Sequence, residues 1–252
     1  MHPQDSRLSE AQRAALTHIV GLVGQRQSVS RSYISEVLHR AGTNLAAYGA
    51  GMESVHAYAR VAIHFHPDRL GTKSTTVAEA LLKEGVYRNQ FETGLSTGGL
   101  SAFPGGARDS WERSLFGGAY HGEGGTDSQR PKYGALELVR YADGPIPRFG
   151  SCYFVLRPSV SGRTSFTFAG SEDPRATERL GMIGQMDNVM AALFREIEAG
   201  GMAAPPWPPF RAPTLGLSNV TVAGLLDVLR ELASPRKEPA DLPAGRAGAR
   251  RA

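Results

Sequence analysis

The sequence predicts an α+β fold, and three observations indicate it. Helical patterns fill the first sixty residues, short β-rich runs divided by turn residues follow, and amphipathic helical patterns return toward the C-terminus. Helices and strands that stay apart along a chain are typical of α+β domains. We therefore expect an N-terminal helical cap, a mixed or antiparallel central sheet with long glycine-rich loops, and C-terminal helices.

Changes in composition predict four segments. We expect a helical cap over residues 1–59 and an α+β core of the catalytic type over residues 60–200. A proline-rich spacer with a final helix follows over residues 201–234, and a disordered basic tail over residues 235–252. Most of the net charge of +4 lies in that tail, whose Pro, Ala and Gly content is typical of a solvated chain end.

The first part of the chain is predicted to hold three helices. Residues 8–26 carry apolar side chains at helical spacing, with Ser9 and Gln12 placed as a capping pair. Residues 30–42 form a second helix, and a third covers about residues 53–60. Two short helices in succession suggest a DNA-binding helix-turn-helix, but the second has few basic residues to lie along phosphates. We prefer a cap packed on the main domain.

The core is predicted to start with a strand. "VAIHFHP", residues 61–67, is apolar, rich in β-formers and ended by proline. A helix follows, in which Thr76 and Glu79 form a capping box and Gly85 ends the last turn. The remaining expected elements are a helical turn over 108–116, strands over 132–141, 151–158 and 163–171, a long helix over 176–200 and a final helix over 219–233.

Two histidines stand one residue apart at the end of the first strand. In an extended chain alternate side chains share a face, so His64 and His66 are expected on one face, opposite Ile63 and Phe65. A rigid strand would thus present both rings to one pocket. His-x-His on a strand is also used for metal binding, and His121 and Asp109 would be the further ligands. Because no spacing ties these two to the pair, a metal site is not favoured, and a structural role for the histidines stays open.

A dense polar segment, "YRNQFETGLSTGG", follows the capped helix. If it is extended, Arg88, Gln90 and Glu92 share one face, while Asn89 and Thr93 lie on the other. The first face suits a substrate with phosphates and hydroxyls, with Arg88 on the anion and Glu92 as an acid or base. A surface strand with an Arg–Glu pair is the alternative.

Basic residues at the strand starts predict a site for a phosphorylated ligand. Lys132 and Tyr133 follow a proline and are placed to reach a cleft edge, and Arg148 begins the next strand. Together with Arg69 and Arg88 they would form a basic cluster suited to a phosphate.

The single cysteine, Cys152, excludes an intramolecular disulfide framework and a cysteine-based zinc site. Its aromatic and β-branched neighbours predict a buried side chain. No run approaches the roughly 18 apolar residues of a membrane span, and the N-terminus lacks the order of a signal peptide. We expect a cytoplasmic protein without membrane contact, although export as a toxin that carries no cleavable signal stays open.

Several longer strings resemble a bacterial family known only as a domain of unknown function. The strings are "HFHPDR", "YRNQFETGLSTGG", "FPGGARDSWERSLFGGAY", "RPKYGALEL" and "PRFGSCYFVL", and they span roughly residues 60–170. No activity comes with this resemblance. A shorter string, "YARVAIHFHPDR", is similar to a J-domain of chaperone partners, which would make the protein a non-catalytic binding module.

The opening of the core also resembles the ADP-ribosyltransferase fold, through a strand that ends in histidine, a short loop and a helix that ends "LLKEG". This resemblance implies that His66 or His64 holds the ribose of NAD and that Tyr133 stacks on the nicotinamide. It also implies that Glu92 stabilises the positive charge formed as nicotinamide leaves. The other glutamates that fit this role are Glu137 and Glu172.

We therefore predict an enzyme that acts on a nucleotide-like or phosphorylated substrate, with NAD as the implied cofactor and a protein or nucleic acid as the acceptor. The alternatives are a metal-dependent hydrolase that uses His64 and His66, and a non-catalytic protein-binding module.

Overall fold

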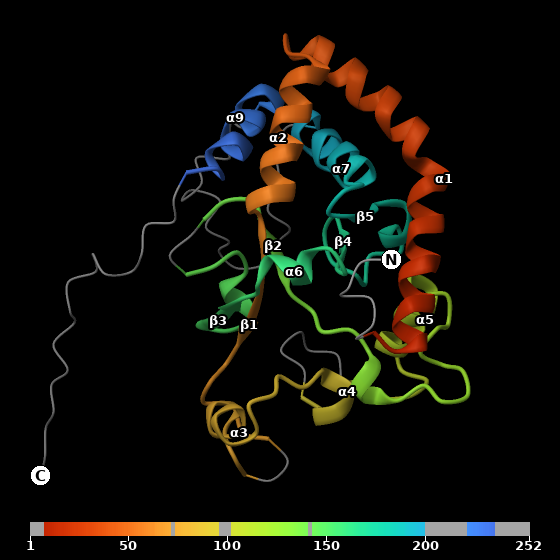
Figure 1. Ribbon diagram of the computed structural model, residues 1–252, viewed down its shortest axis with the longest axis vertical. Helices are drawn as coiled ribbons and strands as arrows, with labels where there is room; N and C mark the ends of the chain where they lie inside the picture. The colour runs from red at the N-terminus through yellow and green to blue at the C-terminus, as the bar shows by residue number, and fades with distance from the viewer. Residues whose placement is uncertain (1–7, 72–73, 96–101, 141–142, 200–220, 235–252) are drawn as a thin grey trace, which may run out of the picture.

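The computed structural model describes residues 8–71, 74–95, 102–140, 143–199 and 221–234. It has the predicted α+β fold. Several helices gather at one end of the molecule, a small antiparallel sheet lies in the middle, and the first helix runs from the helical end down one side into the lower half (Figure 1). None of the described helices is long and apolar enough to cross a membrane.

The first helix, α1 (Glu10–Arg40), is one continuous helix. The predicted capping pair is confirmed, since Ser9 and Gln12 form a capping box at its start. The prediction of two helices is wrong, because the polar residues between the two apolar patterns include no proline and α1 packs against α7 and β5. Without a turn inside α1, the helix-turn-helix interpretation is ruled out.

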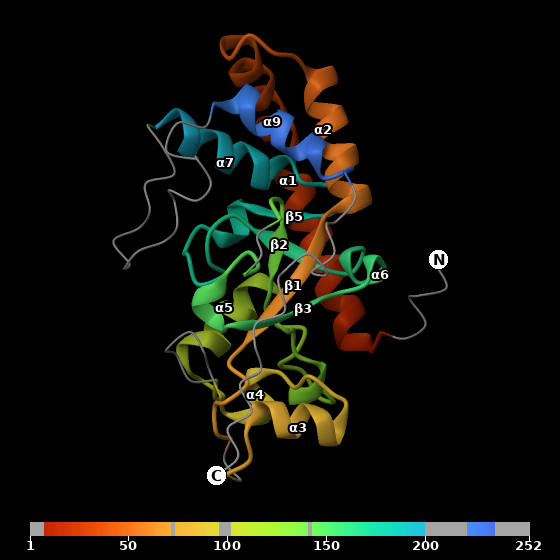
Figure 2. The ribbon, with the colours of Figure 1, turned by 90° about the vertical axis from the view of Figure 1, so that its left-hand side faces the viewer.

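The helical end of the molecule has one shared apolar core. Helix α2 (Leu45–Tyr58) begins earlier than predicted because Asn44 caps it, and it lies against α9 (Val222–Glu231) in both views (Figures 1 and 2). Gly51 of α2 faces α9, and a Cβ there would lie 3.5 Å from Leu226, which is an ordinary van der Waals contact. Helix α7 (Asp187–Glu198) completes the core with Phe194, which is fully buried. The cap therefore shares its core with the C-terminal helices, and the predicted domain boundaries stay a prediction.

The predicted first strand is confirmed as β1 (Arg60–Phe65), and it is the middle strand of the sheet. It pairs antiparallel with β2 (Ala135–Glu137) on one side and with β3 (Cys152–Val155) on the other. Cys152 is exposed, so its predicted burial is wrong. The reason is that β3 is an edge strand that leaves Phe154 exposed as well.

A second, two-stranded sheet joins β4 (Ser165–Thr167) to β5 (Leu180–Met182). The predicted helix over 176–200 is therefore wrong in its first part, which forms the short helix η4 (Ala176–Glu178), then β5 and a turn. Gly181 lets this turn close tightly, because a Cβ there would lie 2.8 Å from the Gln185 carbonyl oxygen.

Short helices form the end of the molecule opposite the long ones. Helix α3 (Val77–Glu84) has the predicted capping box of Thr76 and Glu79, and Gly85 ends it with a φ of 65°. The polar segment after it, predicted to be extended, forms a short helix over residues 90–93. The remaining elements are α4 (Gln90–Thr93), α5 (Ala107–Leu115), η2 (Asp127–Gln129), η3 (Pro147–Phe149) and α6 (Pro158–Ser161).

Three predicted features lie outside the described residues. These are the glycine-rich stretch over 96–101, most of the proline-rich spacer within 200–220, and the basic tail over 235–252.

Candidate functional site

His64 lies on β1 with its ring enclosed, and it is 6% exposed. The Ile146 N–H donates to its Nε2 at 3.2 Å, so the proton is on Nδ1, which donates to the Gly150 carbonyl at 2.9 Å. The ring also stacks on Tyr153. Gly144 lets the loop close over it, since a Cβ there would lie 2.6 Å from Nε2. Both ring nitrogens are therefore bound to backbone, and neither is left to hold a ribose or a metal ion.

His66 follows the last residue of β1 and is half-buried. Its carbonyl accepts from the Arg69 N–H at 3.3 Å, so the chain turns here. The His66 ring has no hydrogen bond to any described residue. Within the described ranges, no three His, Cys, Asp or Glu side chains come together as a metal site. The alternative ligand set is thus not assembled: His64, His66, His121 and Asp109.

The predicted substrate-binding face at α4 does not form. Asn89 caps this helical turn, with its Oδ1 accepting from two N–H groups of the turn. Glu92 completes the capping box by accepting from the Asn89 N–H at 2.8 Å, and it pairs with Arg88 at 3.3 Å. Arg88 is also bound to Glu84 at 2.7 Å. Glu92 therefore serves as a capping residue, and the Arg88 charge is matched by carboxylates.

The other predicted substrate-binding residues are exposed or bound locally. Lys132 and Arg69 are exposed, and Arg148 is exposed beside the ring of the next residue. Thr93 donates to the carbonyl four residues earlier at 3.0 Å, and the buried Oε1 of Gln90 has no partner among the described residues. These contacts do not join the basic side chains Arg69, Arg88, Lys132 and Arg148 to one another, so the phosphate site predicted from them stays a prediction.

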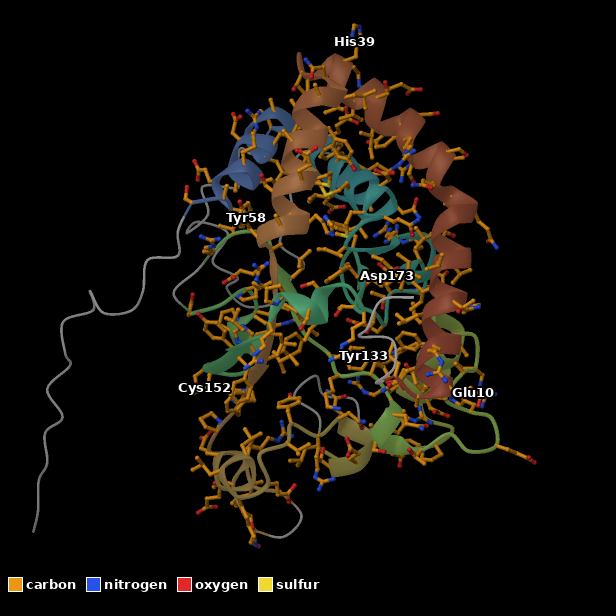
Figure 3. All side chains as sticks on the ribbon, in the orientation of Figure 1. Glu10, His39, Tyr58, Tyr133, Cys152 and Asp173 are labelled. Carbon is orange, nitrogen blue, oxygen red and sulfur yellow. The ribbon has the colours of Figure 1, made fainter. Side chains whose placement is uncertain are left out.

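Charged side chains do come together around helix α5, within the glycine-rich part of the chain. We define the buried charged cluster by six residues: Arg108, Asp109, Glu112, His121, Arg130 and Tyr133. The first three lie on one face of α5, because residues three and four apart in a helix are neighbours. Figure 3 marks Tyr133 in the lower half of the molecule, near the N-terminal part of α1.

Arg130 stands at the centre of this cluster. Its Nη1 lies 2.7 Å from Asp109 Oδ1 and 3.0 Å from Glu112 Oε2. Its guanidinium covers the ring of Phe91, 3.8 Å from the ring centre. The Asn89 amide donates to the Arg130 carbonyl at 3.4 Å, which ties the cap of α4 to the cluster. Asn89 therefore lies next to the cluster, where its side chain holds the Arg130 backbone, and no contact shows the predicted role in substrate binding.

Asp109 accepts hydrogen bonds on both carboxylate oxygens. Its Oδ2 accepts from the Gly105 N–H at 2.9 Å, and its Oδ1 accepts from His121 Nε2 at 2.8 Å. Burial alone would raise the pKa of Asp109, but the hydrogen bonds from Gly105, Arg130 and His121 outweigh burial and lower this pKa to about 2. Asp109 is therefore ionised, and His121 must carry a proton on Nε2.

The opposite ring nitrogen of His121 has no such partner. The His121 side chain is 8% exposed, and its Nδ1 is buried with no hydrogen-bond partner among the described residues. Buried polar atoms are nearly always hydrogen-bonded in folded proteins, so an unpaired one calls for a ligand or a water.

Glu112 and Tyr133 form the other side of the cluster. Glu112 has no exposed surface, and its Oε1 accepts from the Tyr133 hydroxyl at 2.8 Å. Burial raises the pKa of Glu112 against the hydrogen bonds from Tyr133 and Arg130, which favour the charged form. Burial and the nearby Glu112 charge raise the pKa of Tyr133, which therefore keeps its proton. Both oxygens of Glu112 are thus occupied by protein donors.

Arg108 supplies a second positive charge, which favours the ionised form of Glu112 without forming an ion pair with it. It is 6% exposed and makes no ion pair with a described residue. Its guanidinium lies over the rings of Trp111 and Tyr133, at 4.8 and 5.1 Å from their centres. Its Nε is buried and without a hydrogen-bond partner. The cluster therefore contains a guanidinium without an ion pair to a described residue and an imidazole nitrogen without a hydrogen-bond partner among the described residues.

The sequence reasoning found Asp109, His121 and Tyr133 but missed Arg108, Glu112 and Arg130. The signal for two of them was the string "ARDSWERSL", in which charged residues recur at helical spacing beside Trp111. Charged residues on the tryptophan side of a helix face the interior, where they must be paired.

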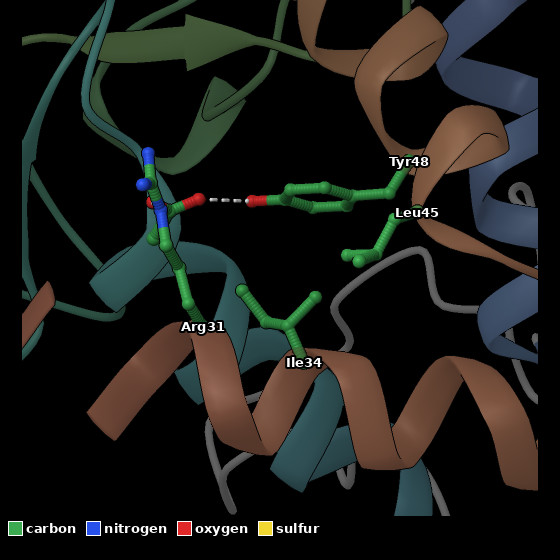
Figure 4. A pocket seen from close by; sticks show the side chains of 5 residues that line it. Arg31, Ile34, Leu45 and Tyr48 are labelled. Carbon is green, nitrogen blue, oxygen red and sulfur yellow. Dashed lines mark hydrogen bonds and ion pairs between the residues drawn. The ribbon is translucent and has the colours of Figure 1, made fainter. Parts of the chain in front are cut away.

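A separate pocket of about 340 Å³ opens between α1, α2 and α7 (Figure 4). Its polar residue is Asp187, which accepts from Tyr48 at 2.8 Å and from Arg31 at 2.7 Å. Ile34 and Leu45 supply its apolar wall. Because both oxygens of Asp187 are already bound, this carboxylate links the three helices and is not free to act as a base.

Residues 60–236 match the family described as "Protein of unknown function (DUF3626)", so the predicted resemblance to a domain of unknown function is confirmed. The match runs from β1 to beyond α9 and includes the whole buried charged cluster. No curated protein matches the chain.

Proposed function

The chain belongs to the DUF3626 family, and we propose that it is an enzyme that acts on a nucleotide-like or phosphorylated substrate at the buried charged cluster. One observation carries this proposal. Asp109 fixes His121 through Nε2, while the buried Nδ1 has no partner among the described residues. An unpaired buried nitrogen is costly, and a substrate proton or a water would satisfy it.

The Asp109–His121 pair has the geometry of an oriented general base. An ionised carboxylate only accepts hydrogen bonds, so the imidazole donates its Nε2–H to Asp109, and in the neutral ring the lone pair is on Nδ1. When Nδ1 takes a proton from a hydroxyl or a water, the carboxylate at 2.8 Å stabilises the positive ring. Glu112 cannot take this role, because Arg130 and Tyr133 occupy its oxygens.

Arg108 is the group that would bind the anionic part of the substrate. Arg130 is matched by Asp109 and Glu112, whereas Arg108 has no ion pair among the described residues. A guanidinium held close to two aromatic rings has its position fixed and presents several N–H donors, which suits a phosphate. An oriented base and a guanidinium without an ion pair to a described residue, both in one cluster, support a substrate that carries both a phosphate and a hydroxyl.

The specific reaction we propose is ADP-ribosyl transfer from NAD. Arg108 would bind the diphosphate, and His121 Nδ1 would accept the proton of an acceptor hydroxyl on a protein or nucleic acid. The acceptor oxygen bonds to the ribose C1′ as the C1′–N bond breaks, and nicotinamide leaves with that electron pair. His66, whose ring has no hydrogen bond to a described residue, is the proposed contact for the ribose.

The test combines ligand binding with turnover by the purified chain. NAD, ADP-ribose and a panel of nucleoside phosphates are screened by thermal shift, and labelled NAD is followed for nicotinamide release. His121→Ala should keep the ligand-induced shift and lose turnover by roughly 10²- to 10⁴-fold, the usual contribution of a general base. Arg108→Gln should lose the shift itself. His56→Ala, at an exposed position on α2, is the matched control.

The outcomes separate the broad proposal from the specific one. If another phosphorylated compound is turned over in a His121-dependent way while NAD is inert, ADP-ribosyl transfer is wrong and the broader proposal stands. If no compound in the panel binds or reacts, or if His121→Ala keeps full activity, the proposal is wrong.

A further inference from the structure

A second group of basic side chains surrounds a pocket of about 250 Å³. Arg26 comes from α1, Arg175 and Arg179 flank η4, and Arg195 comes from α7. We call this the arginine pocket. Its lining includes one carboxylate, Glu178. Four guanidinium groups from three parts of the chain therefore meet around one small concavity.

The arginine pocket is separate from the buried charged cluster. Near the start of α1, the Gln12 side chain donates to the Gln129 carbonyl, next to Arg130 of the cluster, at 3.1 Å. Arg26 lies 14 residues farther along the same helix, which corresponds to about 21 Å of helix. A ligand in the arginine pocket would therefore not touch the Asp109–His121 pair.

Ion pairs hold three of the four guanidinium groups in place. Arg175 and Arg179 share Asp173, at 3.3 and 3.6 Å, and Arg26 pairs with Glu178 at 3.3 Å. Each guanidinium has five N–H donors, and these pairs use only one or two of them. The remaining donors are available to an anion.

The charges around the pocket do not balance. Arg195 lies over the ring of Tyr33, at 4.3 Å, and makes no ion pair with a described residue. Four arginines thus stand against two carboxylates, Glu178 and Asp173, which leaves an excess of two positive charges. An anion with about two negative charges would complete the site.

We propose that the arginine pocket binds the phosphate or diphosphate group of a small ligand. Arginine forks match phosphate oxygens in pairs, and several of them around one point are typical of phosphate recognition. Val29 and Ser30 of α1 also line the pocket, whose volume of about 250 Å³ makes it a small concave site. A concave site suits a small ligand, whereas a nucleic acid backbone is bound along an extended basic surface. This binding goes beyond the proposed catalytic function and does not depend on it.

The test is isothermal titration of the full chain with pyrophosphate and with inorganic phosphate at low salt. Arg195→Gln should weaken pyrophosphate binding by about tenfold, the value of one charge-assisted hydrogen bond. Glu178→Gln should strengthen binding, because it removes the carboxylate that competes with the ligand for Arg26. Arg163→Gln, at an exposed position that does not line the pocket, should change nothing.

Because Glu178→Gln is expected to increase the affinity for pyrophosphate, whereas unfolding can only decrease it, this variant distinguishes a change at the site from a loss of folding. Absence of pyrophosphate binding, or equal affinities in all the variants, would overturn the proposal. A single-stranded oligonucleotide is titrated in parallel. If it binds and the arginine substitutions weaken it while pyrophosphate gives no heat, the site is a nucleic acid contact and the proposal is also wrong. Because none of these substitutions alters the buried charged cluster, failure here leaves the proposed catalytic function to its own test.

Discussion

The strongest prediction concerns the removal of Arg130, the cation at the centre of the buried charged cluster. Arg130→Met keeps the length of the side chain and deletes its charge. The substitution leaves Asp109 and Glu112 without the guanidinium that lies 2.7 and 3.0 Å from them. Both carboxylates are buried, at 4% and 0% exposure, so water does not replace the lost partner.

The expected cost follows from this burial. Breaking a buried ion pair by removing one partner destabilises a protein by about 3–5 kcal/mol. For a chain of this size, that loss lowers the unfolding midpoint by roughly 6–20 °C. The pKa of Glu112 is already raised by burial, and loss of Arg130 raises it further. When a carboxyl has a raised pKa in the folded state, the free energy of unfolding falls as the pH rises through that pKa. The destabilisation of Arg130→Met relative to the unsubstituted protein should therefore be larger at about pH 8 than at about pH 5.

The assay is urea unfolding at both pH values, with Arg88→Met as the matched control. Arg88 also pairs with two carboxylates, Glu84 and Glu92, but its side chain is 47% exposed, so its removal should leave the midpoint unchanged. Glu112→Gln in the Arg130→Met background should recover part of the loss, because an amide needs no cation. A loss below about 1 kcal/mol for Arg130→Met, or equal losses for both arginines, would refute the reasoning.

Three further predictions test single positions. The pKa of Asp109 is lowered to about 2 in the folded protein, so its ionised form stabilises the fold at pH values above the ordinary pKa of an aspartate, and this contribution is lost as the pH falls toward about 2. In urea unfolding measured at a series of pH values, Asp109→Asn should therefore abolish a fall in the free energy of unfolding on the order of 2 kcal/mol at acid pH. Gly144→Ala should cost more than about 1 kcal/mol in the same assay, because the residue has a φ of 75° and a Cβ would lie 2.6 Å from His64, whereas Gly118→Ala, with a φ of 73° and open space, should cost less. Gly51→Ala should instead raise the thermal midpoint by the equivalent of about 0.5–1 kcal/mol, because this glycine is inside α2 and its Cβ would make only an ordinary contact.

Local patterns were sufficient for much of the fold. The capping boxes at Ser9 and Thr76 and the stop at Gly85 are confirmed, because each depends on residues within one helical turn. The first strand is also confirmed, since its apolar run and the following proline act locally. Two of the three errors in helix boundaries have a tertiary cause: α1 continues where it packs on α7, and β5 forms because β4 lies beside it. The third, the early start of α2, comes from the local cap Asn44.

The candidate site shows the same division. The sequence marked Asp109 and His121 as alternative metal ligands and Tyr133 as a substrate-binding residue, but it also marked His64, whose nitrogens are both bound to backbone. Alternation along a strand predicts which face of the sheet a side chain lies on. It does not predict which distant segment packs on that face, and here residues 144–150 pack on the His64 ring.

The α+β class, several starts and stops of the elements and the family could be predicted from the chain, since these depend on neighbouring residues or on long matching strings. Which charged groups meet depends on how the chain packs in three dimensions. Arg130 lies 21 positions from Asp109 and 18 from Glu112, and Arg26 lies far from Arg179 and Arg195 along the chain. Coulomb energy depends on distance in space and on burial, and both are set by packing rather than by sequence spacing.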